Sequence, residues 1–319
     1  MKIPKKIQLA NIPTPLQRIQ FNGTSFYIKR DDLTGVELSG NKVRKLEYLL
    51  YEAKKRKVDY VFTTGGEQSN HARATAIAAS SCGIKSKLFL WGIPKKNIDG
   101  NLFLSKLVDA QIKYLNKEEF FRAYEIMEIE RRKFEKRGKR VFVIPEGGSS
   151  ALGIWGYVNF INELKTQVDL RKMKGILTAA GSGGTSAGLI IGAALNGFKL
   201  KIFAVNVLCD KETIRNRIVS YIDAFKNEFK VKDKIDFSNL EILDGYSKEG
   251  YKHISQDKLK VIKNFASSSG MILDPAYTGK AFYAFNENFL GSKKSTNVMF
   301  VHTGGLFGVF PKRQNYLSV

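Results

Sequence analysis

The feature that most constrains the fold is a regular alternation of short apolar segments with amphipathic ones. The short segments have the length and composition of buried strands, at 25–29, 59–63, 87–91, 141–144, 175–178, 201–205 and 298–301. Helical periodicity marks 42–57, 69–82, 101–109, 117–136, 185–195, 210–230 and 256–268. Apolar strands that alternate with helices are typical of a parallel sheet covered on both faces. The sequence therefore predicts an α/β fold.

Glycine-rich turns directly follow several of the predicted strands. They lie at 65–66, 147–148, 181–184 and 304–305. In open α/β sheets, ligands bind outside the carboxyl ends of the strands. We therefore expect the four turns to assemble one ligand site at that edge.

The turn at 181–184 lies between a strand and a helix, which is a natural anion site. Glycines let backbone N–H groups approach a phosphate, and the first turn of the helix adds free N–H donors. Ser182 and Thr185 add hydroxyl groups. The dinucleotide fingerprint is incomplete, because Ser186 replaces its third glycine and Asn206 replaces its acidic residue. A phosphate site is predicted, and a nicotinamide-dinucleotide oxidoreductase is retained as an alternative of a different class.

Lys42 lies at a predicted helix start, directly after Gly40-Asn41, and Lys45 follows one turn later. The positive end of the helix dipole disfavours a charged amine at that position. A lysine of lowered basicity suits Schiff-base chemistry and proton abstraction. The alternative for Lys42 is an ordinary solvated surface lysine.

The segment Gly65-Gly66-Glu67-Gln68-Ser69-Asn70-His71 opens another predicted helix with a run of polar side chains. Such a helix start can hold a carboxylate, although Ser69 or Asn70 also suits an ordinary helix cap. We expect His71 to be structural. His253 and His302 lack a local metal-ligand pattern, so no metal site is predicted.

The formal net charge of +22 raises the question of nucleic-acid binding. The basic residues are spread along the chain, and aromatic residues do not interleave with them as a base-stacking surface requires. We expect no nucleic-acid partner. A basic cleft that attracts an anionic substrate or a phosphate-bearing cofactor fits the charge better.

The cysteine content and the apolar segments bear on the compartment. Two cysteines, Cys82 and Cys209, are too few for a disulfide framework or a zinc knuckle. No secretory signal is evident after the basic start, and no apolar run reaches the length of a membrane span. We expect a cytoplasmic protein with no membrane partner.

Taken together, the motifs resemble those of the D-cysteine desulfhydrase and 1-aminocyclopropane-1-carboxylate (ACC) deaminase family. In chain order they are KRDDLTG at 29–35, GNKVRKLE at 40–47, GGEQSNH at 65–71, PEGGS at 145–149 with Gly153 and Gly156, GSGGT at 181–185, LDPAYTGK at 273–280 and HTGG at 302–305. The resemblance covers almost the whole chain, and the ordered set is specific.

The resemblance implies a type II fold that depends on pyridoxal 5′-phosphate (PLP), like that of the tryptophan synthase β subunit. Two domains are expected, each with a mostly parallel sheet flanked by helices. Residues 1–47 plus 161–319 would form the large PLP-binding domain, and residues 48–160 a small domain inserted in it. A small amino-acid substrate and a homodimer are also implied.

The resemblance further implies roles for individual residues. Lys42 would hold PLP as a Schiff base and move the substrate Cα proton. The phosphate would be held by Lys45, Gly181, Ser182, Gly183, Gly184 and Thr185. Asn70 would bind the ring hydroxyl, and Gln68, Ser69 and Asn70 the substrate carboxylate, with Ser69 also placed for proton transfer. Tyr277, and on a weaker match Tyr251, would lie near the substrate side chain.

Two positions favour one activity within the family. ACC deaminases typically carry Glu and Leu where this chain has Thr278 and Thr303, which are implied to lie near the cofactor ring. A hydroxyl opposite the pyridine nitrogen need not keep that nitrogen protonated, whereas a carboxylate would. We therefore expect β-elimination of D-cysteine or a close analogue.

Two other activities remain open. One is deamination of ACC to 2-oxobutyrate and ammonia, and the other is L-cysteate sulfo-lyase activity, whose sulfonate substrate would suit the positive charge. Glu67, where the family commonly has an apolar residue, either repels a carboxylate or points away from it.

Overall fold

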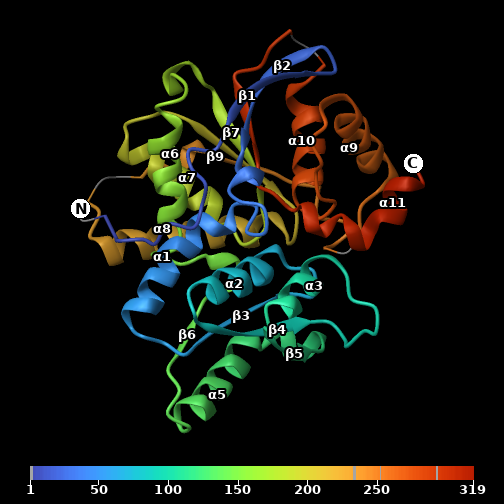
Figure 1. The fold of residues 1–319 in the computed structure, drawn as a ribbon. Coiled ribbons are helices and arrows are strands. Elements are labelled where there is room, and N and C mark those ends of the chain that lie inside the picture. Colours follow the sequence, from blue (N-terminus) through green and yellow to red (C-terminus); the bar gives the residue numbers. More distant parts are fainter. Residues whose placement is uncertain (1–2, 233–234, 252, 292–293) are drawn as a thin grey trace.

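The computed structural model describes residues 3–232, 235–251, 253–291 and 294–319, which contain two separate β-sheets, each flanked by helices (Figure 1). The predicted α/β fold is confirmed. Across these residues, no helix combines the length and apolar character that a membrane span needs.

The larger sheet has six strands in the order β1-β2-β10-β7-β8-β9. Their bounds are β1 Leu16–Phe21, β2 Thr24–Arg30, β7 Gly175–Ala180, β8 Lys201–Asn206, β9 Leu240–Leu243 and β10 Val298–His302. Every neighbouring pair is parallel except β1 and β2, which form a hairpin around Asn22 and Gly23. Both turn residues have positive φ, as a tight two-residue hairpin requires.

The smaller sheet is wholly parallel, with the strand order β5-β4-β3-β6. Its strands are β3 Tyr60–Gly66, β4 Lys85–Trp91, β5 Gln111–Leu115 and β6 Val141–Val143. Alternate residues of β3 face opposite layers, so that Val61 packs with α2 and Phe62 packs with α5.

Helices cover both faces of each sheet. They are α1 Lys42–Lys55, α2 Asn70–Ser81, α3 Gly100–Leu107, α4 Lys117–Phe121, α5 Ala123–Glu135, α6 Trp155–Leu164, α7 Gly184–Leu195, α8 Lys211–Phe229, α9 Gln256–Ser269, α10 Thr278–Phe289 and α11 Arg313–Leu317. On the large sheet, α6, α7 and α8 share one apolar core, and α9 and α10 share the other (Figure 1).

The structure differs from the predicted elements in two ways. The single helix expected at 117–136 is two helices, because the chain leaves helical geometry at Arg122 between α4 and α5. The sequence prediction also missed β1, β5, β9, α6, α10 and α11. β5 is short and mostly polar, and the GlyXXGly spacing around Trp155 obscured the start of α6.

The division into residues 1–47 plus 161–319 and residues 48–160 stays a prediction. Both of its boundaries lie within helices, the first in α1 and the second in α6. α6 packs closely against α7, because Gly188 and Gly192 leave room there for Tyr157 and Ile161. The chain segments on either side of the second boundary thus belong to the same layer of the large sheet.

Candidate active site

The four glycine-rich turns meet around one inner cavity, which lies between the carboxyl ends of strands from both sheets. Residues after β3, β6, β7 and β10 all line it, together with the start of α1. The lining includes Asn41, Lys42, Ser69, Asn70, His71, Glu146, Gly147, Gly181, Ser182, Gly183, Thr185, Ser186, Asp274, Tyr277, Thr303 and Gly304. The structure therefore brings together turns that are far apart in the sequence.

Lys42 is the first residue of α1, and its side chain reaches the inner cavity. Its Nζ donates a hydrogen bond to Asn41 Oδ1 at 3.1 Å. Burial lowers the pKa of Lys42 to about 8, although the negative charges of Glu146 and Asp274 oppose the shift. Lys42 is thus an amine that is readily deprotonated near neutral pH.

Lys45 is fully buried one turn along α1. Its Nζ donates to Gly147 O at 3.2 Å and to Ser149 Oγ at 3.1 Å. Burial and the neighbouring charge of Lys42 hold the pKa of Lys45 well below its usual value. Lys45 lies behind the start of α7, where a Cβ on Gly184 would come within 2.9 Å of its Nζ.

The start of α7 is an open helix terminus that fits an anion. Its N-cap, Gly183, has φ +92° and supplies no side-chain cap. Thr185 Oγ1 accepts from Asn41 Nδ2 at 3.1 Å, and Ser182 Oγ lies 2.9 Å from Ser149 Oγ. The buried Ser186 hydroxyl has no hydrogen-bond partner among the described residues. Uncapped N–H groups, spare hydroxyls and a buried lysine are groups that could hold a phosphate, and this set is called the phosphate cradle below.

The polar segment after β3 serves both as a helix cap and as cavity wall. Ser69 is the N-cap of α2, and its Oγ accepts from Ala72 N at 3.1 Å. Asn70 Oδ1 accepts from Asn101 Nδ2 at 3.0 Å. Both side chains also line the inner cavity.

The Gln68 side chain is occupied by the protein itself. Its Nε2 donates to Asp99 O at 3.0 Å, and its Oε1 accepts from Asn101 N at 3.0 Å. These bonds hold the start of α3 against the start of α2. They use one of the two N–H groups of Gln68 Nε2, so one N–H remains for a substrate carboxylate.

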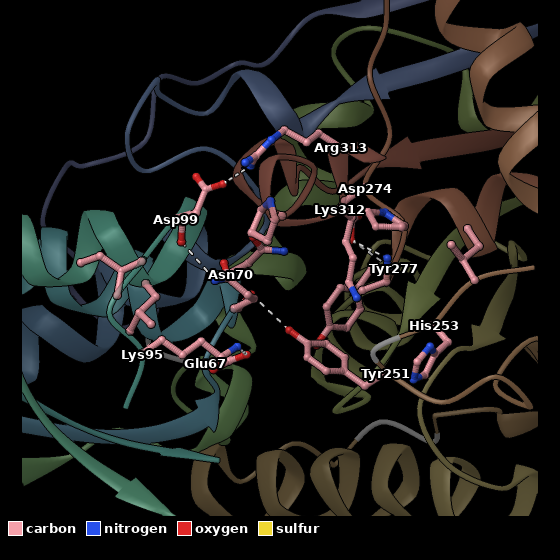
Figure 2. A pocket seen from close by; sticks show the side chains of 18 of the residues that line it. Glu67, Asn70, Lys95, Asp99, Tyr251, His253, Asp274, Tyr277, Lys312 and Arg313 are labelled. Atoms are coloured by element: carbon pink, nitrogen blue, oxygen red, sulfur yellow. Dashed lines mark hydrogen bonds and ion pairs between the residues drawn. The ribbon is translucent and has the colours of Figure 1, made fainter. Parts of the chain in front are cut away.

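A second, outer cavity of about 650 Å³ adjoins the inner one (Figure 2). The two cavities share Asn70, Asp274 and Tyr277. Glu67 and Lys95 lie on one wall and Tyr251, Tyr277 and His253 on the other, as Figure 2 shows. The outer cavity thus lies directly against the cavity that Lys42 lines.

Tyr251 and Tyr277 pack edge to face, with ring centroids 5.8 Å apart. The Tyr251 hydroxyl donates to Gln68 O at 3.1 Å, which links the segment before α9 to the start of α2. Burial raises the pKa of both phenols. Both tyrosines therefore stay protonated at neutral pH, as neutral hydrogen-bonding groups.

The two threonines singled out in the sequence, Thr278 and Thr303, have different surroundings. Thr303 lines the inner cavity. Thr278 is buried, and its hydroxyl donates to Asp274 Oδ1 at 2.6 Å and accepts from Asp274 N at 2.9 Å. Its hydroxyl proton is therefore already committed to Asp274.

Asp274 and Glu146 are cavity residues to which the sequence prediction gave no role. Asp274 is buried and accepts hydrogen bonds from the N–H groups that start α10, and burial raises its pKa. Burial also raises the pKa of Glu146, against the opposing charges of Arg217 and Lys42. Both residues stand in motifs quoted above, and the signal for Glu146 was its position directly before the glycine-rich turn at 147–148.

Glu67 is paired on the outer wall. Its Oε1 accepts from Lys95 Nζ at 2.5 Å. Its Oε2 is buried and has no partner among the residues described. The charge of Glu67 is therefore largely neutralised by Lys95, and it lies outside the inner cavity.

Comparison with known proteins identifies the family of this chain. A family model for pyridoxal-phosphate dependent enzymes matches residues 7–304. A Thermotoga maritima protein named as a candidate ACC deaminase is 42% identical over 96% of this chain and 97% of its own length. A mitochondrial bifunctional D-cysteine desulfhydrase/ACC deaminase of Arabidopsis thaliana is 38% identical over 98% of this chain and 80% of its own.

A solved structure described as an ACC deaminase homologue is also similar. It superposes with a TM-score of 0.89 at 33% identity, over 99% of this chain and 96% of that one. The fold thus agrees with that of the solved relative. The chain belongs to the pyridoxal-phosphate dependent enzyme family, within its D-cysteine desulfhydrase and ACC deaminase branch, and its cofactor is pyridoxal 5′-phosphate.

Proposed function

We propose that this enzyme catalyses β-elimination of D-cysteine or a close analogue, with release of pyruvate, ammonia and sulfide. The observation that carries the proposal is the pair Thr278 and Thr303, which stand where ACC deaminases of the family carry Glu and Leu. The name of the Arabidopsis relative includes both activities, so the family is compatible with either.

The surroundings of Thr278 support this choice. Thr278 is a neutral hydroxyl that hydrogen-bonds Asp274 Oδ1 at 2.6 Å, so it presents no negative charge to the cofactor ring, unlike a glutamate at this position. A ring nitrogen opposite a hydroxyl need not be protonated, and the cofactor is then a weaker electron sink. Loss of a thiolate from Cβ needs less electron withdrawal than opening of a cyclopropane ring.

The residues of the chain divide the work of binding the cofactor. Lys42 would hold it covalently, and the phosphate cradle of Lys45, Gly181, Ser182, Gly183, Gly184 and Thr185 would hold its phosphate. Asn70 would contact the ring hydroxyl. Bound pyridoxal phosphate supplies the electron sink that makes the substrate Cα proton acidic.

Other side chains would bind the substrate and move protons. The N–H groups at the start of α2, with Ser69 and Asn70, suit the substrate carboxylate. The lowered pKa of Lys42 makes its amine available to accept the Cα proton near neutral pH. Tyr277 and Tyr251 stay protonated and border the space left for the substrate side chain.

The test is a side-by-side assay of the purified, PLP-loaded enzyme. Pyruvate and sulfide are measured from D-cysteine and L-cysteine, 2-oxobutyrate from ACC, and pyruvate and sulfite from L-cysteate. We expect D-cysteine to be turned over fastest, with a heat-inactivated enzyme as the blank. Faster turnover of ACC or L-cysteate than of every thiol amino acid would overturn the proposal.

A further inference from the structure

Glu146 is an ionisable side chain in the inner cavity that the roles assigned above leave unused. It follows β6 and precedes Gly147 and Gly148, which both have positive φ. Its backbone N–H donates to the Tyr124 hydroxyl at 2.9 Å, so α5 holds the turn in place. Glu146 lines the inner cavity but not the outer one.

The carboxylate of Glu146 is free to bind a ligand. Within the described part of the chain, it makes no hydrogen bond and no ion pair. Glu146 and Lys42 line the same cavity, where the negative charge of Glu146 favours the charged form of the Lys42 amine and Lys42 favours the ionised form of the Glu146 carboxylate. Both residues therefore border the inner cavity, and no ion pair joins them in the described part of the chain.

Both oxygens of Asp274, the other carboxylate in the inner cavity, already accept hydrogen bonds from the protein. Its Oδ1 accepts from Thr278 N at 2.8 Å and from Thr278 Oγ1 at 2.6 Å, and its Oδ2 accepts from Ala276 N and Tyr277 N, both at 3.0 Å. A carboxylate has about four lone-pair sites, and these bonds use them. Of the two carboxylates, Glu146 is the one that can take a proton from a ligand.

The surrounding charges are mixed. Arg217 on α8 and Lys42 on α1 favour the ionised form of Glu146, while burial opposes it and raises the pKa. The phenols of Tyr124, Tyr221, Tyr251 and Tyr277 also lie within its influence, and each has a raised pKa. Glu146 thus has neutral phenols and two cations as its ionisable neighbours, besides Asp274.

An amino-acid substrate brings a proton that must be removed. Its amino group is mostly a cation at neutral pH, and a cation cannot displace Lys42 as a nucleophile. The substrate nitrogen must reach the place where Lys42 is bonded, which is the inner cavity. Glu146 borders that place.

We propose that Glu146 accepts one proton from the ammonium group of the substrate, so that the neutral substrate amine can displace Lys42. An N–H bond of the ammonium breaks and its electron pair stays on nitrogen, while an O–H bond forms on the carboxylate. The proton stays on Glu146, so the released Lys42 amine remains uncharged and can accept the substrate Cα proton. The inference rests on the proposed amino-acid substrate, and it holds for either handedness and for any leaving group.

The test follows amine exchange rather than turnover. Glu146→Gln keeps the shape of the side chain and removes its basicity. Stopped-flow absorbance of the PLP-loaded enzyme is recorded at neutral pH with two amines that lack a leaving group. Alanine, as either enantiomer, arrives as a cation, whereas hydroxylamine is uncharged.

We expect Glu146→Gln to slow exchange with alanine by about 10²-fold, the lower range of general base catalysis, and to change exchange with hydroxylamine by less than about twofold. Glu125→Gln, an exposed residue of α5 paired with Arg122, is the matched control and leaves both rates unchanged. Equal slowing with both amines, or no slowing with either, would overturn the proposal.

Failure of the inference and failure of the proposed function are distinguishable. If D-cysteine is not eliminated but alanine exchanges normally, only the proposed reaction fails. If neither enantiomer of alanine exchanges with the wild-type enzyme while hydroxylamine does, the amino-acid substrate is wrong, and the role of Glu146 is overturned with it.

Discussion

At the scale of single residues, the site places charges where water cannot easily stabilise them. Lys42 and Lys45 share one cavity region, and burial lowers the pKa of both amines. A buried amine disfavours its charged form, so the folded protein binds protons there less readily than the unfolded chain does. The phosphate cradle thus costs stability until an anion occupies it.

The first prediction concerns the stability of the PLP-free protein. Because the pKa of Lys42 falls to about 8 on folding, the unfolded chain binds more protons between about pH 8 and 10.5. The penalty from Lys42 is therefore full below that window, and stability rises with pH through it. Lys42→Met removes the penalty, so the variant is expected to be more stable than the wild type at neutral pH.

Urea denaturation of both PLP-free proteins at about pH 7 and about pH 10 measures the effect. The difference in the free energy of unfolding between Lys42→Met and the wild type is expected to be smaller at the higher pH. If this difference stays constant or grows as pH rises, burial of the charged Lys42 amine is not what destabilises the PLP-free wild type.

The second prediction at this scale concerns the buried ion pairs that Arg44 of α1 makes with Asp31 and Glu163. Arg44 donates to Asp31 and to Glu163, and Lys29 also donates to Glu163. Arg44→Met leaves two carboxylates short of a partner, and removal of one member of a buried ion pair costs about 3–5 kcal/mol. Arg171→Met, which removes an exposed pair with Asp169, is expected to cost about 0–1 kcal/mol.

The free energy of unfolding from denaturant titration distinguishes these two variants. Similar losses would mean that the network is worth no more than a surface pair. Because Lys42 lies on the same helix as Arg44, the network also holds the start of α1 at the cavity.

At the scale of elements, helix α7 does two tasks with its glycines. Gly184 stands at the cavity end, where a Cβ would lie 2.3 Å from Ser149 Oγ and 2.9 Å from Lys45 Nζ. Gly188 stands one turn further on, where a Cβ would lie 2.6 Å from the Tyr157 Cβ of α6. One glycine shapes the phosphate cradle, and the other allows close helix packing.

These positions give a matched pair of predictions. Gly184→Ala is expected to displace Lys45 and Ser149 and to weaken PLP binding by about tenfold, the loss of a single charge-assisted hydrogen bond. Gly188→Ala is expected mainly to lower the melting temperature, since it separates α6 from α7. Fluorescence titration with PLP and thermal melts of both variants test the distinction. If both variants lose the same PLP affinity and the same melting temperature, the two glycines do not have separate roles in cofactor binding and helix packing.

At the scale of the whole molecule, we propose that the enzyme is a homodimer with no nucleic-acid partner. Large apolar side chains are exposed on several elements, including Phe103 and Leu107 of α3 and Phe310 near the C-terminus. Exposed apolar residues of this size suit a protein interface. The formal net charge of +22 suits anionic ligands and cofactors.

The corresponding prediction is a solution mass of twice the 35.9 kDa chain. Size-exclusion chromatography with light scattering measures it at several protein concentrations. A mass of one chain at every concentration would contradict the dimer. A duplex DNA added at physiological salt is expected to leave the mass unchanged, because non-specific binding of a basic protein weakens steeply with salt.

Much of the fold and several site residues follow from local sequence patterns. The period of apolar residues predicts most strands and helices, since each element needs only its own residues to show it. Positive-φ glycines such as Gly147 and Gly304 mark the turns, because side chains are strained there. Weakly patterned elements such as β5 escaped prediction, because their neighbours in the sheet stabilise them.

The sequence by itself determined the α/β class, the glycine-rich turns and a lysine at the start of α1. Only the tertiary structure decided the partners of the cavity residues. Lys45 meets Ser149 behind α7, Tyr251 meets the backbone of Gln68, and Asp274 accepts four hydrogen bonds while the Glu146 carboxylate has no partner in the described part of the chain. The physical reason is that hydrogen bonds and burial depend on distances between residues far apart along the chain, and no local pattern encodes those distances.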